Sequence, residues 1–344
     1  MNNMGKTIPG GRRPKPVASH PVWRSAAPAA GAIINNSQGL EMGFPAVMLP
    51  GQITFMNTIS KLFACACALL VSGAAVTTLQ ATPIPDDCKS GDFAIGCQAW
   101  SFNRFTVMDA IRKTSEVGGK VIEFYPGQKL RPENPAAFNH DSPDDQIQLV
   151  QAQLAKYHIR AVNYGVVDIP KDEAGARKVF DFAKKLGLYA ITTESIGSLD
   201  TIEKLVKEYD IRVGIHDHPR RANDPGYRNW DPNFILSLVK DRDARIGSCA
   251  DTGHWVRSGL EPVDCLRILK GHIISSHLKD LNEKSPGAHD VPYGTGVSHV
   301  TAILDELKAQ NFAGNISVEY EYNWEASQPE IGQCIGFVRG YGSH

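Results

Sequence analysis

The chain has 344 residues, of which 42% are hydrophobic and 21% are charged, a composition typical of a globular protein and not of a disordered or collagen-like one. This length allows one large domain or two ordinary ones. The formal net charge of −1 offers no basic face to a nucleic-acid backbone, so no nucleic-acid partner is expected.

The N-terminal part divides into two segments. Residues 1–55 are rich in Gly, Pro, Ala and Asn and lack helical or strand periodicity, so we expect them to be disordered. Met56 then opens a segment with a lysine, an apolar run at residues 62–76 and small residues as far as Ala81. This order predicts a secretory signal peptide over residues 56–81, with a buried core helix as the alternative.

The predicted signal peptide bears on membrane insertion, on the start codon and on the cysteines. The apolar run is shorter than the about 20 residues that a membrane span needs, so we expect export without a stable span. If Met56 is the true start codon, residues 1–55 are upstream sequence. Cys88 and Cys97 lie just after the predicted signal and, in an exported protein, could form a disulfide.

From residue 92 to residue 344, short apolar runs alternate with amphipathic helical stretches. The predicted strands are residues 93–100, 120–125, 159–167, 189–195, 211–218, 244–251, 272–280 and 315–321. The predicted helices are residues 106–118, 144–157, 173–187, 198–209, 231–241, 262–271 and 299–310. This alternation predicts a parallel (β/α)8 TIM barrel over residues 92–344. A doubly wound sheet is the alternative, but no glycine-rich loop follows the first strand.

Chemically active side chains follow most of the predicted strands at their C-terminal ends. They are Gln98, Trp100, Glu123, Glu194, His216, His218, Asp251, His254, His277, Lys279, Glu319 and Glu321. In a TIM barrel these strand ends meet at one face, where the active site lies. A single His or Glu at a strand end is usually an ordinary surface or hydrogen-bonded residue. Charged groups at so many buried strand ends, however, need one another or a metal ion.

A single divalent metal is predicted at this face, with Asp251, His277 and Glu319 as ligands. The fourth ligand is His216 or Glu194. Glu319 and Glu321 alternate onto one side of their strand, and two such carboxylates cannot both stay ionised cheaply without a cation. Mixed His and carboxylate donors suit Mn, Mg, Zn or Co, and the sequence does not distinguish these metals.

The remaining residues receive catalytic or substrate-binding roles. The predicted catalytic residues are Glu194, His218, His254, Lys279 and Glu321. Among them, Lys279 and His254 are expected to hold substrate oxygens, and a carboxylate or imidazole is expected to remove a proton. The predicted substrate-binding residues are Trp100, Glu123 and Trp255, since an indole ring can stack on the apolar face of a sugar. The loop after residue 218 is expected to form a lid.

Four segments, in this order, resemble the xylose-isomerase-like TIM-barrel superfamily. They are residues 251–255 (Asp-Thr-Gly-His-Trp), 276–280 (Ser-His-Leu-Lys-Asp), 292–296 (Pro-Tyr-Gly-Thr-Gly) and 317–321 (Ser-Val-Glu-Tyr-Glu). The superfamily contains sugar isomerases and epimerases, inosose dehydratases and the endonuclease IV type of apurinic endonuclease. The resemblance implies a metal site at Asp251, His277 and Glu319, with His216 standing where the family often has a Glu.

That departure bears on the reaction. Epimerases of the superfamily are thought to use two opposed glutamates, so His216 favours a reaction that needs one base, such as isomerisation, dehydration or β-elimination. Glu194 would restore the second carboxylate if it faces the site.

The sequence therefore predicts an exported, metal-dependent isomerase, epimerase or lyase that acts on a sugar or keto-sugar through an enediolate. The alternative is a non-catalytic carbohydrate-binding barrel, which the departure at His216 would suit. An endonuclease IV-like nuclease is less favoured because it needs further metal ligands on early strands. A homo-oligomer stays open.

Overall fold

A computed structural model describes residues 83–342 of the chain. The predicted disordered segment (residues 1–55) and signal peptide (residues 56–81) therefore lie outside the described residues. Across residues 83–342, no helix combines the length and the apolar character that crossing a membrane requires.

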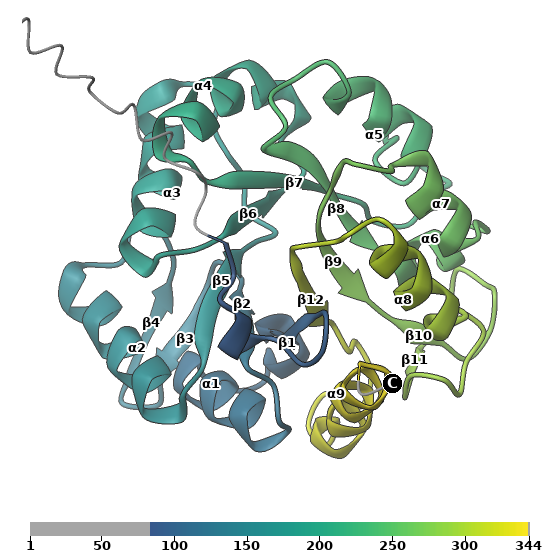
Figure 1. The fold of residues 1–344 in the computed structure, drawn as a ribbon. Helices are drawn as coiled ribbons and strands as arrows, with labels where there is room; N and C mark the ends of the chain where they lie inside the picture. Colours follow the sequence, from purple (N-terminus) through teal and green to yellow (C-terminus); the bar gives the residue numbers. More distant parts are fainter. Residues whose placement is uncertain (1–82, 343–344) are drawn as a thin grey trace, which may run out of the picture. The chain divides into compact units, whose positions relative to one another are not determined.

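Eight parallel strands close into a barrel in the order β1-β12-β9-β8-β7-β6-β5-β2 (Figure 1). They are β1 (Ala94–Gln98), β2 (Val121–Phe124), β5 (Arg160–Tyr164), β6 (Ala190–Thr193), β7 (Arg212–His216), β8 (Ile246–Asp251), β9 (Ile273–Leu278) and β12 (Asn315–Val318). Because β1 pairs with both β12 and β2, the sheet has no open edge, which excludes the doubly wound alternative. The TIM barrel is confirmed, and each predicted strand contains one of these eight.

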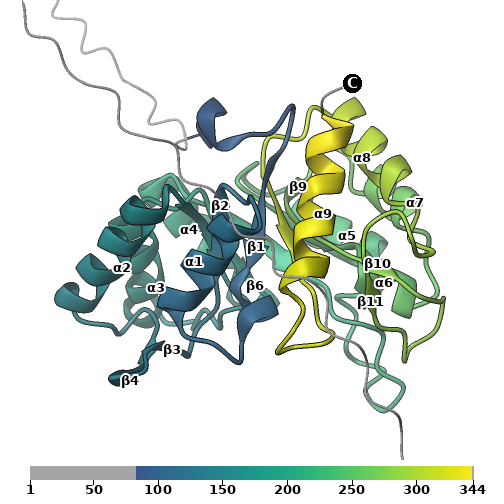
Figure 2. The ribbon, with the colours of Figure 1, turned by 90° about the horizontal axis from the view of Figure 1, so that it is seen from below.

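Helices surround the strands, as Figure 1 shows. They are α1 (Val107–Glu116), α2 (Asp144–Tyr157), α3 (Glu173–Leu186), α4 (Leu199–Tyr209), α5 (Pro232–Val239), α6 (Thr252–Arg257), α7 (Pro262–Ile268), α8 (Val300–Ala309) and α9 (Gln328–Tyr341). Every predicted helix is present. The sequence pattern missed α6, which has only one and a half turns, and α9, whose three glycines weaken the helical signal. Figure 2 shows α9, in yellow, running along the barrel beside β1.

Two short hairpins, neither of them predicted, interrupt the connections that follow barrel strands. After β2, strands β3 (Gln128–Arg131) and β4 (Asn134–Phe138) pair antiparallel. After β9, β10 (Asp280–Leu281) pairs with β11 (Asp290–Val291). Three 3-10 turns complete the described elements, at η1 (Asp86–Cys88), η2 (Ala99–Phe102) and η3 (Ile196–Ser198).

The barrel strands are buried on both faces, which explains why their sequences are apolar without a strict alternation. The core fills the layer between strands and helices. One part of it is the set of edge-to-face ring contacts among Phe124, Phe138 and Phe182. Cys88 and Cys97, whose pairing the sequence left open, are both free thiols. Cys97 lies fully buried in β1, where burial raises its thiol pKa to about 12.

Candidate metal centre and active site

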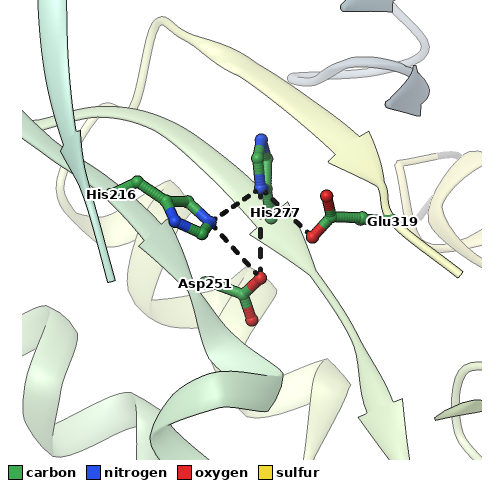
Figure 3. A group of neighbouring side chains, drawn as sticks. All are labelled: His216, Asp251, His277 and Glu319. Atoms are coloured by element: carbon green, nitrogen blue, oxygen red, sulfur yellow. Dashed lines mark hydrogen bonds and ion pairs between the residues drawn. The ribbon is translucent and has the colours of Figure 1, made fainter. Parts of the chain in front are cut away.

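Four side chains from consecutive barrel strands converge at the C-terminal end of the barrel (Figure 3). His216 ends β7, Asp251 ends β8, His277 lies in β9, and Glu319 directly follows β12. The Nδ1 atom of His277 lies 3.2 Å from His216 Nε2 and 3.4 Å from Glu319 Oε2. Asp251 Oδ2 lies 3.7 Å from His216 Nε2 and 3.9 Å from His277 Nδ1. The structure thus brings the four predicted ligands together.

The geometry and chemistry of this cluster fit one divalent cation. Ligand atoms bound to an ion at about 2.1 Å lie roughly 3.0–3.4 Å from one another, close to the observed separations. One candidate atom from each of the four residues lies within 4.8 Å of the others, and all four side chains are buried. Two imidazoles and two carboxylates suit Mn, Mg, Zn or Co and do not distinguish among them. Burying the two carboxylates also requires nearby positive charge.

Asp251 serves two purposes because of its position at the junction of β8 and α6. Its Oδ1 accepts a hydrogen bond from the backbone N–H of His254, 2.8 Å away, and so caps the N-terminus of α6. Its own N–H donates to Asp217 Oδ1 at 2.9 Å. With Oδ1 and the backbone fixed, Oδ2 is left facing the cluster. The Asp-Thr-Gly-His sequence therefore holds one carboxylate oxygen of Asp251 in a fixed position facing the cluster.

Lys279 supplies positive charge beside the cluster. Its fully buried Nζ donates to Asp251 Oδ2 at 2.7 Å, to Glu319 Oε2 at 2.6 Å and to Glu321 Oε2 at 3.0 Å. Burial alone would lower the pKa of Lys279, but these carboxylates raise it well above its ordinary value. Gly253 makes room for the lysine, because a Cβ there would lie 2.7 Å from Lys279 Cβ. Lys279 is therefore an ammonium that contacts both carboxylates of the cluster, Asp251 and Glu319, as well as Glu321. It makes no hydrogen bond to the two imidazoles of the cluster.

On the other side of the cluster, Glu194, His218 and Tyr227 form a hydrogen-bonded group. Glu194 Oε1 lies 2.6 Å from His218 Nδ1 and accepts from the hydroxyl of Tyr227 at 2.7 Å. The same hydroxyl accepts from the backbone N–H of His218 at 2.8 Å. Burial would raise the pKa of Glu194, but the nearby His216 ring, 3.7 Å away, and the contact with His218 bring it well below its ordinary value. Glu194 is thus a carboxylate that orients the His218 ring and leaves Nε2 available.

A cavity of about 290 Å³ opens above the cluster. The residues that line it are Gln98, Trp100, Tyr125, Pro126, Val166, His216, His218, Glu319 and Glu321. Its volume lies near the lower end of small-molecule sites, which span about 300–1,000 Å³. Trp100, 39% exposed, packs edge-on against Tyr125 at the rim. These two rings form an apolar wall of the cavity, in contrast to the polar lining at His218, Glu319 and Glu321. The cavity suits a small polar molecule with one apolar face.

Two predicted substrate contacts need correction. Glu123 is fully buried and does not line the cavity; its Oε2 lies 3.0 Å from His277 Nε2 and accepts from Ser317 Oγ at 2.8 Å. It therefore orients the His277 ring from behind. Trp255 is 1% exposed and packs in the core. Sequence position places a residue near a strand end but does not say whether its side chain reaches the cavity or is buried beside it.

The remaining predicted residues divide by burial. Trp100, His218 and Glu321 line the cavity, as expected for groups that meet a substrate. His254 and Lys279 are buried beneath it, 4% and 0% exposed, in contact with Asp251. Burial would raise the pKa of Glu321, but Lys279 and Arg257 bring it down to about 2, so this carboxyl is ionised.

Two residues in contact with this site were missed from the sequence. Tyr227 belongs to the loop after β7, and no local pattern indicates that a loop residue folds back onto Glu194. Arg257 lies one helical turn after His254, and its guanidinium reaches the ring of that histidine at 3.1 Å. The i, i+3 spacing on α6 is a signal that would have found it.

Asp280 explains another of the sequence motifs. Its Oδ2 accepts from the backbone N–H groups of Gly294 and Gly296, each at 2.9 Å, and its Oδ1 accepts from that of Ser298 at 2.9 Å. A Cβ on Gly296 would lie 2.4 Å from Asp280 Oδ1, so only glycine fits there. The motif at residues 292–296 is therefore a loop anchored by a buried carboxylate and takes no part in the cluster.

Comparison with known proteins agrees with this geometry. Residues 111–339 match the family model described as xylose isomerase-like TIM barrel. No functionally curated protein matches the chain.

Solved structures add three points of comparison. An uncharacterised protein from Parabacteroides distasonis shares 32% identity, with a TM-score of 0.59 over 72% of this chain and 99% of that one. D-allulose 3-epimerase from Methylomonas sp. shares 14% identity (TM-score 0.56; 76% and 100% covered). A Mycobacterium smegmatis xylose isomerase-like protein, solved in complex with magnesium, shares 13% (TM-score 0.56; 72% and 96% covered). The last two likenesses, at such low identity, establish the fold alone.

Proposed function

The chain belongs to the xylose isomerase-like TIM barrel family, and from its site we propose that it is an isomerase or epimerase of a sugar or keto-sugar. The observation that carries this proposal is the placement of two proton-transferring groups on opposite walls of one cavity. Glu194, which orients His218, directly follows β6, and Glu319 and Glu321 follow β12. In the barrel order, three strands separate β6 from β12 in either direction.

Proton transfer at carbon is the step that these walls support. His218 Nε2 takes the proton from the carbon next to a substrate carbonyl, while Glu194 holds the ring through Nδ1 and stabilises the imidazolium that forms. Glu321 faces the same cavity from the other wall. A proton returned by His218 to the neighbouring carbon gives isomerisation. Epimerisation requires that Glu321, which is ionised, first takes up a proton from solvent and then delivers it to the opposite side of the same carbon, while His218 releases its proton to solvent. Glu194 thus supplies a carboxylate in place of the Glu that the family often has at the position of His216.

His216, Asp251, His277 and Glu319 would hold the divalent cation. Bound there, it would supply positive charge beside the substrate oxygens on which negative charge develops. The chain's own contribution is electrostatic as well. Lys279 neutralises the buried carboxylates next to the cavity floor, and the apolar wall at Trp100 and Tyr125 excludes water from one side of the sugar. The similarity to a D-allulose 3-epimerase supports a ketose as the first substrate class to test.

Incubation of the Mn²⁺- or Co²⁺-loaded protein with a panel of ketoses and keto-sugars in D₂O tests this proposal. We expect deuterium to enter the carbon next to the carbonyl, and a new isomer or epimer to accumulate, as followed by NMR. Elimination products would point to the lyase alternative instead. Calorimetric binding without any deuterium exchange would favour a non-catalytic carbohydrate-binding barrel and overturn the proposal.

We also propose that the protein is exported. The support is the sequence of residues 56–81, where an apolar run follows a lysine and ends in small residues. N-terminal sequencing of the protein from its native source should find a mature start near residue 82. Recovery of peptides from residues 1–50 would contradict both the cleavage and the proposed start at Met56.

A further inference from the structure

Arg257 is a buried cation that none of the steps above uses. It ends α6, and its side chain is 9% exposed. The guanidinium Nη1 lies 3.1 Å from His254 Nδ1 and donates to Glu321 Oε2 at 3.0 Å. Nη2 donates to Asp290 Oδ2 at 3.2 Å, and Nε donates to the carbonyl of Ala288 at 3.2 Å. Arg257 therefore joins α6, the segment after β12 and the β10–β11 hairpin.

The contact with His254 fixes the tautomer of that imidazole. A guanidinium has only N–H donors and no acceptor, and it stays protonated in proteins. His254 Nδ1 must therefore accept, which places the ring proton on Nε2. Nε2 lies 3.5 Å from Asp251 Oδ2, the carboxylate oxygen that faces the four-residue cluster. The proton of His254 is thus directed toward the cluster and not toward the outside of the barrel.

The contact with Glu321 fixes a cavity group in the same way. Arg257 and Lys279 both donate to Glu321 Oε2, so that oxygen is held between two cations. Oε1 is left as the oxygen able to meet a ligand in the cavity that Glu321 lines. Asp290 Oδ2, itself bound to Arg257, accepts from the backbone N–H of Glu321 at 3.2 Å. One guanidinium thereby sets the orientation of two site residues, one from α6 and one from the segment after β12.

We propose that Arg257 is a positioning residue that holds His254 as the Nε2–H tautomer and holds Glu321 with one oxygen facing the cavity. Arg257 does not line the cavity over the cluster, so its effect on a substrate passes through these two residues. The consequence for the reaction rests on the proposed function, but the tautomer assignment does not.

The direct test is NMR of histidine-labelled full-length protein, with His254 assigned from the peak lost in His254→Gln. We expect the two-bond ¹H–¹⁵N pattern of an imidazole protonated at Nε2 alone. In Arg257→Met, which keeps the aliphatic stem, the pattern should change to a mixture of tautomers or to the Nδ1–H form. A wild-type His254 protonated at Nδ1, or a pattern unchanged in Arg257→Met, would overturn the proposal.

Kinetics give a second reading once turnover is established. Arg257→Met should lower kcat by about 10- to 100-fold, the range found when residues that orient ligands are lost. Arg257→Lys, which can still donate to one acceptor, should recover part of that loss. Asp290→Asn is the matched control, since it alters the same guanidinium without touching His254 and should leave the His254 spectrum unchanged. An inactive wild type with the expected NMR pattern would refute the proposed function and leave this assignment standing.

Discussion

Two walls of the barrel mouth carry ionisable groups, and they satisfy these groups in different ways. On the β6–β7 wall, Glu194 and His218 pair with each other and with the Tyr227 hydroxyl, while the guanidinium of Arg221 lies 3.9 Å from Glu194 Oε2, beyond hydrogen-bonding distance. On the β9–β12 wall, Lys279 and Arg257 neutralise Glu319 and Glu321. His218 keeps 41% of its side chain exposed, whereas Lys279 keeps none.

The difference indicates that the two walls have different roles in the reaction. A proton carrier must change charge during the reaction, so it needs a partner that tolerates both states and access to the substrate. A group that stabilises charge works best when it is fixed and dry. We therefore assign the removal of the substrate proton to the β6–β7 wall. Charge compensation falls to the β9–β12 wall, where Glu321 also faces the cavity as the group for the opposite side of the substrate. The four-residue cluster lies between the two walls.

The largest effect, a loss of both metal and activity, is expected from removing a cluster residue. His277→Ala should abolish stoichiometric metal content and lower activity by about 10²–10³-fold or more, because the strongest positive charge near the substrate is lost. Elemental analysis and turnover measure the two losses. His272→Ala, which alters a histidine just before β9 at the far end of the barrel, is the control and should change neither. Full metal occupancy in His277→Ala would refute the assignment of this cluster.

Glu194→Gln tests whether the two walls have separate roles. We expect activity to fall by about 10²–10⁴-fold while metal content stays at the wild-type level, because Glu194 orients a base and does not hold the ion. Deuterium exchange at the substrate carbon and elemental analysis are measured on the same preparation. Loss of metal in Glu194→Gln would instead make Glu194 the fourth ligand and remove the distinction between the walls.

Lys279→Met tests charge compensation through stability. It leaves Asp251, Glu319 and Glu321 without their shared cation, and breaking a buried pair costs about 3–5 kcal/mol. Denaturant unfolding of the metal-free protein measures this loss. Lys308→Met removes an exposed partner of Asp92, both side chains being 55% exposed, and should cost at most about 1 kcal/mol. Equal losses in the two variants would argue against a special role for Lys279.

The smallest effect is expected from Tyr227→Phe. This change removes the hydrogen bond to the Glu194 carboxylate and the one accepted from the His218 N–H, while the Glu194–His218 contact remains. A hydrogen bond to a charged group contributes about 1.5–3 kcal/mol. Because the Glu194–His218 contact remains, we expect the lower end of this range, roughly a tenfold loss in kcat, and little change in KM. An unchanged kcat would show that the loop after β7 does not contribute to positioning Glu194.

Much of the molecule followed from its sequence. Alternating apolar runs and amphipathic stretches determined the barrel, because parallel strands buried on both faces and their crossover helices each leave their own periodicity. The strand ends also determined which residues could reach the cluster, since all eight strands point the same way. Asp251, His277 and Glu319 followed from the sequence in this way, whereas the fourth position stayed open between His216 and Glu194; the structure places His216 beside the other three.

Only the tertiary structure decided which hydrogen-bond and charge partners those residues have. Whether Glu123 meets a substrate or orients His277, whether Lys279 faces the cavity or lies beneath it, and whether Tyr227 and Arg257 belong to the site all depend on contacts between distant segments. A periodic pattern records which face of a strand or helix is buried. It does not record which atom of another element lies across from it, and hydrogen bonds and charge pairs depend on that atom.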